Sequence, residues 1–353
     1  MISVPLLEVV QCPDCGGTIS RTGDRIACSN CGRVFDHDDG YLDLRPRTAF
    51  TEQTKYLDEA LHADARHTTV SPPVLGAKIR NDMLRRFLRL QPADRVVDLG
   101  CGSGRTLIWN ANTAALVVGI DVSPYFAREA IERSDVMLGD LRRLPVRNRQ
   151  FNKAWSLDVL EHLSPQALGE VLSEANRVLA DNGALFVYTH VRQNGWLATG
   201  VRVINRFAQL CERMGLIDLR QERLRKSDHL NPIKDHEDLA RVVAAHGFTI
   251  ERKVYYTPIV GAFVENVLVR MAERRLTRRA TGGSRTGANQ DDDQAIRDVR
   301  ARAQARVSRR GITYRGLLAV TALMKLDVIL FGHVKSGPFF ALLRKTRAVG
   351  EAR

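Results

Sequence analysis

Residues 96–104 place a glycine-rich turn directly after a short β-branched run that ends in an acidic residue. Their sequence is Val-Val-Asp-Leu-Gly-Cys-Gly-Ser-Gly, so the glycines follow the pattern G-x-G-x-G. Because glycine has no Cβ, such a turn lets the backbone approach a nucleotide-like ligand at the end of the first strand of an α/β fold. A dinucleotide-binding turn instead reads G-x-G-x-x-G. The spacing therefore favours a different nucleotide-like ligand, with a purely structural tight turn as the alternative.

A second apolar run, 115–120, ends in Asp121. An acidic residue about twenty residues beyond the glycines, at the tip of the second strand, is placed to accept hydrogen bonds from ribose hydroxyls. The following Ser123 and Pro124 predict the start of a helix, with Ser123 as the N-cap and Pro124 in the first turn. On the alternative interpretation, Asp121 only caps that helix.

Three further segments continue the alternation of strands and helices. Residues 136–145 contain Gly-Asp-Leu directly after a third apolar run. Residues 151–163 form a fourth strand that ends at Asp158 and leads into Leu-Glu-His. Residues 177–188 contain the end of a helix, a Gly-containing turn and a fifth strand. This succession predicts a parallel sheet with helices on both faces.

In order and spacing, the motifs of residues 94–190 resemble those of the class I S-adenosylmethionine-dependent methyltransferases. The resemblance implies a Rossmann-like sheet, with Asp140 at the adenine amino group and Asp158 facing the methyl donor. Lys153 and Trp155 depart from the small or β-branched residues that are usual in the fourth strand of that family. The cofactor-binding residues that the resemblance implies are Asp98, Gly100, Cys101, Gly102, Gly104, Asp121, Val122, Asp140, Leu141 and Asp158.

Two C-x-x-C-G units near the start of the chain predict a metal site. Each unit presents two thiolates from one tight turn, and two facing units form a tetrahedral sulfur site. The expected ligands are Cys12, Cys15, Cys28 and Cys31. We recognise no secretory signal peptide, which favours metal over disulfides. We expect a closed, structural Zn²⁺ site, with rubredoxin-like iron as the main alternative and a pair of disulfides as a weaker one.

The residues that follow these cysteines, through about residue 46, resemble the zinc ribbon of bacterial 23S rRNA guanine-N1 methyltransferases. They also resemble small zinc ribbons that activate or precede other methyltransferases. The first resemblance implies an RNA substrate. The net charge of +13 is consistent with an anionic partner, either RNA or a membrane surface, although basic proteomes make many such proteins. The low aromatic content of 6% does not favour a surface for single-stranded RNA.

Several histidines are candidates for the acceptor site. His229 begins a His-Leu-Asn segment that precedes an amphipathic helix ending at Gly247-Phe248, an arrangement that resembles the small-molecule, quinone and lipid branch of the family. If the acceptor is protonated, a base is required. The candidate catalytic bases are His162, His190 and His229, with Glu161 behind them. The sequence shows no convincing second set of metal ligands.

The remaining chain suggests four parts. We expect a zinc ribbon at 1–46, a linker at 47–75, the methyltransferase domain at 76–256 and a helical extension at 257–353, in which the polar, Gly/Arg/Asp-rich stretch 274–311 is expected to be disordered. The domain contains a helical insertion near 191–226, in which the apolar residues at helical spacing are expected to pack within a lid.

Two apolar stretches in the extension, 254–271 and 316–334, are too short or too interrupted to span a bilayer. They are expected either to pack on the domain as a lid or to lie at a membrane surface with Arg344, Lys345 and Arg347 near anionic headgroups. We therefore predict a cytoplasmic enzyme, in contact at most with the inner face of a membrane, that methylates a small or lipid-like acceptor. The alternatives are an RNA methyltransferase and a non-catalytic binding module.

Overall fold

The computed structural model describes residues 2–47, 70–220, 229–280 and 311–346, together with the single residues 223, 302 and 307. Most of the expected linker therefore lies outside the described residues. The same holds for most of the segment that we expected to be disordered, 274–311, and for Arg347.

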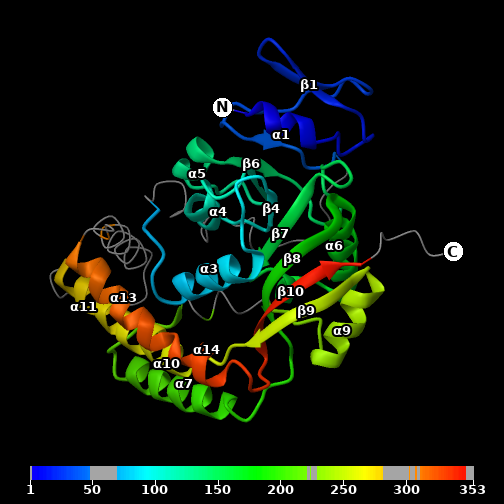
Figure 1. The fold of residues 1–353 in the computed structure, drawn as a ribbon. Helices are drawn as coiled ribbons and strands as arrows, with labels where there is room; N and C mark the ends of the chain where they lie inside the picture. The colour runs from blue at the N-terminus through cyan, green and yellow to red at the C-terminus, as the bar shows by residue number, and fades with distance from the viewer. Residues whose placement is uncertain are drawn as a thin grey trace.

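An eight-stranded sheet forms the centre of the molecule, in the order β3-β6-β5-β4-β7-β8-β10-β9 (Figure 1). All neighbouring strands are parallel except the two pairs made by β10. The strands are β3 (Leu42–Asp43), β4 (Arg95–Leu99), β5 (Leu116–Asp121), β6 (Asp135–Leu138), β7 (Phe151–Leu157), β8 (Leu179–His190), β9 (Phe248–Tyr255) and β10 (Pro338–Lys345). The inner strands are continuous apolar runs because helices cover both faces. The predicted Rossmann-like fold is confirmed.

Helices on the two faces of the sheet enclose two apolar cores. Leucines and valines of α6 and α9 pack on one face, and apolar residues of α3, α4 and α5 pack on the other. These helices are α3 (Leu75–Leu88), α4 (Arg105–Asn110), α5 (Arg128–Arg133), α6 (Pro165–Val178) and α9 (His236–Ala245). Asp235 caps α9. As expected from the sequence, Gly247 follows the end of this helix, in the left-handed conformation.

The two unusual residues of the fourth strand, Lys153 and Trp155, both lie on β7. The side chain of Trp155 is fully buried in the core that contains α3. The ammonium group of Lys153 lies 2.5 Å from the carboxylate of Asp94, which precedes β4. The large aromatic ring thus fills the core, and the charged residue forms an ion pair near the amino-terminal end of β4.

The N-terminal segment packs on the β6 edge of the sheet (Figure 1). It contains α1 (Val4–Val9) and the hairpin formed by β1 (Ile19–Thr22) and β2 (Arg25–Cys28). Its last strand, β3, pairs with β6 and extends the central sheet. Leu6 and Val9 of α1 belong to the same buried cluster as Met137 of β6. The segment therefore shares a core with the sheet.

Strand β10 corrects the expected C-terminal extension. Residues 338–345 were expected to follow a helical region outside the domain, but they form the strand between β8 and β9. The five residues Phe339–Leu343 are buried because both neighbouring strands and both apolar cores surround them. A Ser-Gly-Pro turn before this short apolar run is the sequence signal that would have indicated a strand.

Strand β10 also corrects the expected place of the basic residues. The ammonium group of Lys345 is buried and donates to the carbonyl oxygens of Asn176 and Leu179. Arg344 donates to Glu251 and to the carbonyl oxygen of Asn182. Burial of Lys345 contradicts the membrane-surface alternative for this residue, whereas the side chain of Arg344 is 38% exposed and pairs with Glu251.

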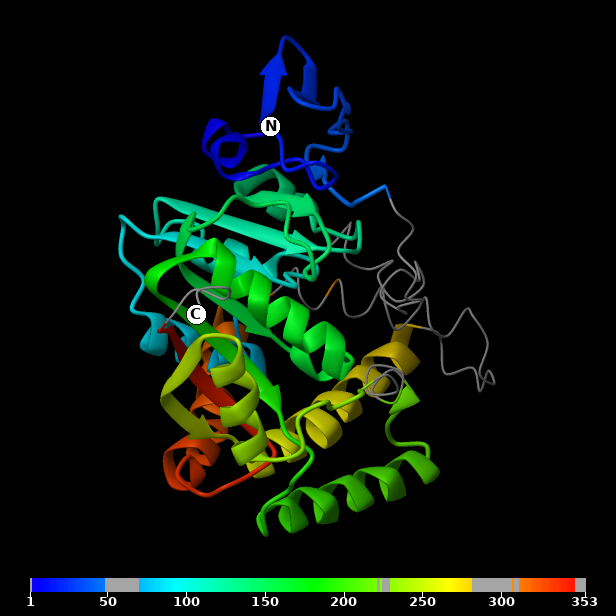
Figure 2. The same ribbon diagram turned by 90° about the vertical axis from the view of Figure 1, so that its right-hand side faces the viewer.

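The remaining helices gather at the opposite end of the molecule from the N-terminal segment (Figures 1 and 2). They are α7 (Ala198–Arg213), α10 (Ile259–Phe263), the π-helix Val264–Val269, α11 (Arg270–Ala280), α13 (Ile312–Met324) and α14 (Leu326–Phe331). The expected apolar helix from Val254 begins later, because 254 and 255 still belong to β9. Among the described residues, no helix is long and apolar enough to cross a membrane.

Two of these C-terminal segments dock on the start of α3. The backbone amide of Leu75 donates to the hydroxyl of Thr321 at 2.8 Å, and that of Gly76 donates to the carboxylate of Glu265 at 3.1 Å. Lys325 pairs with Asp82, also on α3. These contacts match the expectation that the two apolar stretches pack on the domain.

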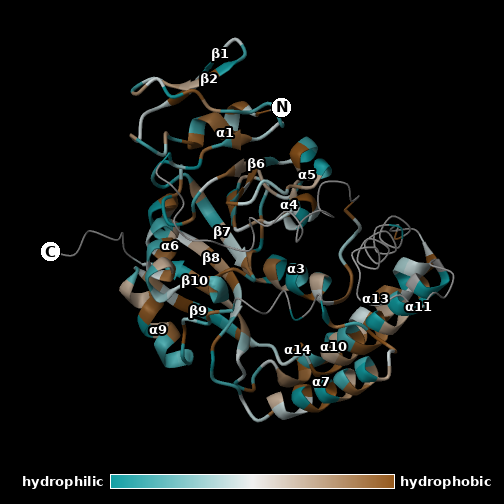
Figure 3. Ribbon diagram, turned by 180° about the vertical axis from the view of Figure 1, so that it is seen from behind, coloured by the Kyte–Doolittle hydropathy of each residue, from teal (hydrophilic) through white to brown (hydrophobic). Residues whose placement is uncertain are grey.

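Helix α7 leaves an apolar stripe exposed. We expected its apolar residues to pack within the lid, but only Ala208 and Cys211 are buried. Figure 3 shows apolar and polar residues alternating along this helix. The side chains of Val203, Phe207, Leu210 and Met214 are between 46% and 59% exposed. The expected packing is wrong for these four residues, because α7 packs on α10 and the π-helix, and its buried cluster with Val267 contains only Ala208 and Cys211 of this helix.

Candidate functional site

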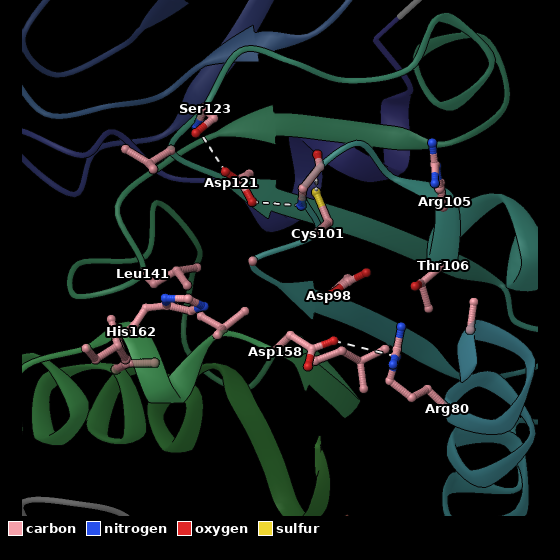
Figure 4. A pocket seen from close by; sticks show the side chains of 18 of the residues that line it. Arg80, Asp98, Cys101, Arg105, Thr106, Asp121, Ser123, Leu141, Asp158 and His162 are labelled. Carbon is pink, nitrogen blue, oxygen red and sulfur yellow. Dashed lines mark hydrogen bonds and ion pairs between the residues drawn. The ribbon is translucent and has the colours of Figure 1, made fainter. Parts of the chain in front are cut away.

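A cavity of about 450 Å³ opens at the carboxyl ends of β4, β5 and β7 (Figure 4). All of the expected cofactor-binding residues line it except Gly104. The lining residues of that set are Asp98, Gly100, Cys101, Gly102, Asp121, Val122, Asp140, Leu141 and Asp158. The motif residues therefore line one cavity, as expected for a bound nucleotide-like ligand at the ends of parallel strands.

The glycines of the turn serve different purposes. Gly100, Gly102 and Gly104 all have positive φ angles, of 83°, 53° and 80°. A Cβ on Gly102 would meet nothing within 4 Å, so this backbone faces the open cavity. A Cβ on Gly104 would lie 2.6 Å from the Cβ of Ala130 on α5. Gly104 was expected to bind the cofactor, but in the structure it permits close packing of two helices.

Asp121 organises the turn with both carboxylate oxygens. One accepts from the backbone amide of Gly102 at 2.7 Å, and the other accepts from that of Ser123 at 2.9 Å. Burial raises the pKa of the Asp121 carboxyl group. A carboxylate offers about four lone-pair positions, so acceptor capacity remains for ribose hydroxyls.

The predicted helix start at Ser123 is wrong. Helix α5 begins at Arg128, and its N-cap is Ala127. The amide of Ala127 donates to the carbonyl oxygen of Ser103, which holds the segment against the glycine turn before the helix begins. Asp121 therefore does not cap α5, and the alternative interpretation of this residue is also excluded.

Two further acidic residues lie on the cavity wall. Asp98 is almost fully buried, and burial, together with the negative charge of Asp121, raises its pKa to about 8. Asp140 accepts from the guanidinium group and the backbone amide of Arg142. This loop conformation leaves Asp140 and the adjacent Leu141 lining the cavity.

Helix α3 contributes a residue that the sequence motifs did not indicate. Arg80 lines the cavity, and its Nε atom lies 3.5 Å from the carboxylate of Asp158 (Figure 4). Its guanidinium group also lies over the ring of Tyr188, 5.6 Å from the ring centroid. Asp158 itself has a positive φ of 56°, directly after β7. The α3 residues precede the glycine turn, and no motif spacing marks them.

Helix α4 adds further side chains to the cavity wall. Arg105, Thr106 and Trp109 line it from the first turns after the glycines. The indole nitrogen of Trp109 donates to the carbonyl oxygen of Ser71 at 3.0 Å, which links α4 to the chain that precedes α3.

The three candidate catalytic histidines come together with Glu161. The ring centroids of His162 and His229 are 4.6 Å apart, and those of His190 and His229 are 5.1 Å apart. One carboxylate oxygen of Glu161 lies 3.8 Å from Nδ1 of His190. Burial, together with the charge of Asp158, raises the pKa of Glu161 to about 8. Of the three histidines, His162 lines the cavity.

The four N-terminal cysteines also converge. Their sulfur atoms all lie within 4.8 Å of one another. The Sγ atoms of Cys12 and Cys31 are 3.7 Å apart, and those of Cys15 and Cys28 are 3.5 Å apart. A tetrahedral ion with Zn–S bonds near 2.3 Å separates its sulfurs by about 3.8 Å, whereas a disulfide requires about 2.05 Å. The residues therefore fit a tetrahedral metal ion.

Residues 97–187 match the family described as "Methyltransferase domain". An uncharacterized methyltransferase of Synechocystis is 28% identical over 113 residues, which are 31% of this chain and 53% of that protein. Malonyl-[acyl-carrier protein] O-methyltransferase of Herminiimonas arsenicoxydans is 35% identical over 109 residues, 30% of this chain and 41% of that protein. Cyclopropane-fatty-acyl-phospholipid synthase of Escherichia coli is 31% identical over 113 residues, 30% of this chain and 29% of that protein.

This chain thus spans about half the length, or less, of these curated relatives. The matched residues extend from β4 to β8, which includes the glycine turn, Asp121, Asp140 and Asp158. These residues form a methyltransferase domain. The matched part excludes the cysteine cluster, α3, α7 and the C-terminal helices.

Proposed function

We propose that the protein is an S-adenosylmethionine-dependent methyltransferase that acts on a small or lipid-like acceptor. The observation that carries this proposal is the cavity at the strand ends, which the methyltransferase motif residues line. Its size and its acidic residues fit a cationic nucleoside ligand, because Asp98, Asp121 and Asp158 all contribute to its wall. The open backbone at Gly102 provides the close approach that such a ligand needs.

Each residue has a distinct part in the proposed reaction. Asp121 binds ribose hydroxyls, Asp140 binds the adenine amino group, and Asp98 and Asp158 offer negative charge to the cationic part of the cofactor. S-adenosylmethionine supplies an activated methyl group, so the protein mainly positions the acceptor in line with it. Where the acceptor carries a proton and no metal ion is bound beside it, His162, His190 or His229 is the candidate base that removes it.

A lipid-like acceptor is supported by two observations. The first is the exposed apolar stripe on α7, formed by Val203, Phe207, Leu210 and Met214. The exposed Arg202 and Arg206 lie beside this stripe on the same helix. The second is that relatives of the domain are named for acyl-carrier and phospholipid substrates.

We propose that α7 lies at the headgroup region of an anionic membrane on the cytoplasmic side.

RNA is the alternative acceptor, supported by the net charge of +13 and the N-terminal cysteine cluster. The two acceptors are separated by radiolabelled methyl transfer to total lipid and total RNA fractions in parallel. We expect label in the lipid or small-molecule fraction. Label in RNA alone would overturn the lipid proposal and support a ribbon that recognises RNA.

The cysteine cluster is proposed to hold one structural Zn²⁺ through Cys12, Cys15, Cys28 and Cys31. Four protein ligands close the coordination sphere, so the ion stabilises structure and does not bind substrate. A red, iron-containing preparation would favour rubredoxin-like iron instead.

Calorimetry tests cofactor binding directly. Replacing Asp121 by Ala removes the acceptor for ribose hydroxyls and for two backbone amides. Loss of one charged hydrogen bond weakens binding by about 10- to 150-fold. The matched control is Asp24→Ala in the exposed turn between β1 and β2, which should bind like the wild type. Equal affinity of Asp121→Ala and the wild type would overturn the assignment.

A further inference from the structure

We infer that Glu161, His162 and His229 form a second metal site, for a divalent transition-metal ion, beside the methyl-donor end of the cavity. The binding of the ion depends only on these residues. Its part in methyl transfer rests on the proposed function.

The three side chains are close enough to share an ion. One carboxylate oxygen of Glu161 and one ring nitrogen from each histidine all lie within 4.8 Å of one another. Ligand atoms bound to one ion at about 2.1 Å are separated by about 3 to 3.5 Å. Small rotations of the two imidazole rings therefore bring all three atoms into a coordination sphere. The sulfur atoms of the four cysteines lie within the same distance of one another.

Glu161 is held in place from two sides. Its carboxylate is buried and accepts from the hydroxyl of Thr189 at 2.7 Å. Its backbone carbonyl oxygen accepts from the amide of Asn231 at 2.9 Å, which ties the chain beside His229 to the short helix that contains Glu161 and His162. A carboxylate fixed in this way presents its second oxygen in a defined direction.

His190 is placed to orient the histidine ligand. Its Nε2 atom lies 3.2 Å from Nδ1 of His229. A histidine that binds a metal through one ring nitrogen is usually oriented by a hydrogen bond at the other. If His229 binds the ion through Nε2, its Nδ1 remains available for His190. His190 is then a positioning residue outside the coordination sphere.

The proposed metal site lies where an ion could contact the acceptor. His162 lines the cavity together with Asp158, so the proposed site adjoins the cavity. Two histidines and one carboxylate leave such positions open, as in catalytic zinc and iron sites. An ion there would bind an acceptor hydroxyl and lower its pKa, so that its proton passes to solvent. The oxygen then forms the O–CH₃ bond while the C–S bond breaks and its electron pair stays on sulfur.

Binding of Mn²⁺ to the full-length, zinc-loaded protein tests the site. Thiolates select Zn²⁺ over Mn²⁺, so the cysteine cluster should not take up the probe. Free Mn²⁺ is followed by electron paramagnetic resonance, and a second equivalent of Zn²⁺ is followed independently by calorimetry. We expect one saturable site per chain. His190→Ala should weaken binding by about 10- to 100-fold, as expected for loss of an orienting partner.

Glu161→Gln and His229→Ala should weaken binding at least as much as His190→Ala. Glu161→Gln keeps an acceptor for Thr189, so its fold should be preserved. His333→Ala, at an exposed histidine after α14, is the matched control and should bind like the wild type. The inference is overturned if neither ion binds at a second site, or if Glu161→Gln and His229→Ala both bind like the wild type.

S-adenosylmethionine titrations separate this result from the proposed function. A wild-type protein that binds the metal ion but not S-adenosylmethionine would retain the metal site and overturn the methyltransferase proposal. A wild-type protein that binds S-adenosylmethionine but no second metal ion would overturn the metal site and retain the methyltransferase proposal. Unchanged cofactor affinity in the three variants would also show that each is folded.

Discussion

The Nε2 atom of His190 lies 3.2 Å from the Nδ1 atom of His229, although 39 residues separate them in the chain. His190 is the last residue of β8, and His229 follows the inserted segment that contains α7. Backbone hydrogen bonds join the two stretches, since Arg192 and Gln193 donate to Ile233 and Lys234. The chain therefore leaves the sheet at the end of β8 and, after the insertion, returns beside the same strand end. This return brings both imidazoles beside Glu161.

The affinity for S-adenosylmethionine should depend on pH through Asp98. Its pKa of about 8 means that the carboxyl group is largely protonated at neutral pH without ligand. The cationic cofactor favours the carboxylate, so binding below this pKa must release a proton. Affinity should therefore rise by up to about tenfold per pH unit until the pH reaches the pKa, and then level off. Calorimetry between about pH 6 and pH 9 measures this, and Asp98→Asn should abolish the slope. A flat wild-type profile would contradict the assignment.

Replacing Gly104 by Ala should destabilise the fold without weakening cofactor binding directly. The new Cβ would lie 2.6 Å from that of Ala130, and the φ of 80° adds strain. We expect the free energy of unfolding to fall by about 1–3 kcal/mol. Urea denaturation measures the change.

The double variant Gly104→Ala with Ala130→Gly provides the control for this steric contact. Removal of the Ala130 methyl group should make the double variant more stable than the sum of the single changes predicts. Purely additive changes would mean that the two helices do not meet at these residues.

Loss of the proposed zinc ion should destabilise the whole domain. Strand β3 pairs with β6, and the amide of Leu44 donates to the carbonyl oxygen of Leu138, two residues before Asp140. Cys12→Ser should reduce the metal content from about one zinc per chain to near zero and lower the temperature of a single unfolding transition. Cys211→Ser, at a buried cysteine far along the chain, should keep the zinc. Two separate transitions in the wild type would contradict the shared core.

The apolar stripe on α7 should bind anionic vesicles. Phe207 and Leu210 are 46% and 50% exposed, and burying each side chain in a lipid surface contributes on the order of 1 kcal/mol. Phe207→Ser with Leu210→Ser should reduce co-sedimentation with such vesicles at low salt by about tenfold or more. Val34→Ser, at an exposed valine of the N-terminal segment, is the matched control. Binding that persists in the double variant would exclude α7 as the contact.

The cofactor half of the molecule could be predicted because each of its signals is local. A strand, its terminal acidic residue and the following turn occupy only a few consecutive residues, as in 96–104. Parallel strands bring their carboxyl ends to the same side of the sheet. The motifs alone therefore predict that Asp98, Asp121 and Asp140 line one cavity, as they do. The two C-x-x-C-G units are local signals of the same kind.

Only the tertiary structure decided the contact of Arg80 with the cavity, the histidine cluster and the place of residues 338–345. Arg80 reaches Asp158 because α3 crosses the strand ends, and the histidine cluster forms because an insertion returns to β8. Residues 338–345 enter the sheet between β8 and β9 and pair antiparallel with both strands. Such contacts depend on register and packing between distant segments, and periodicity within a short window carries no information about either.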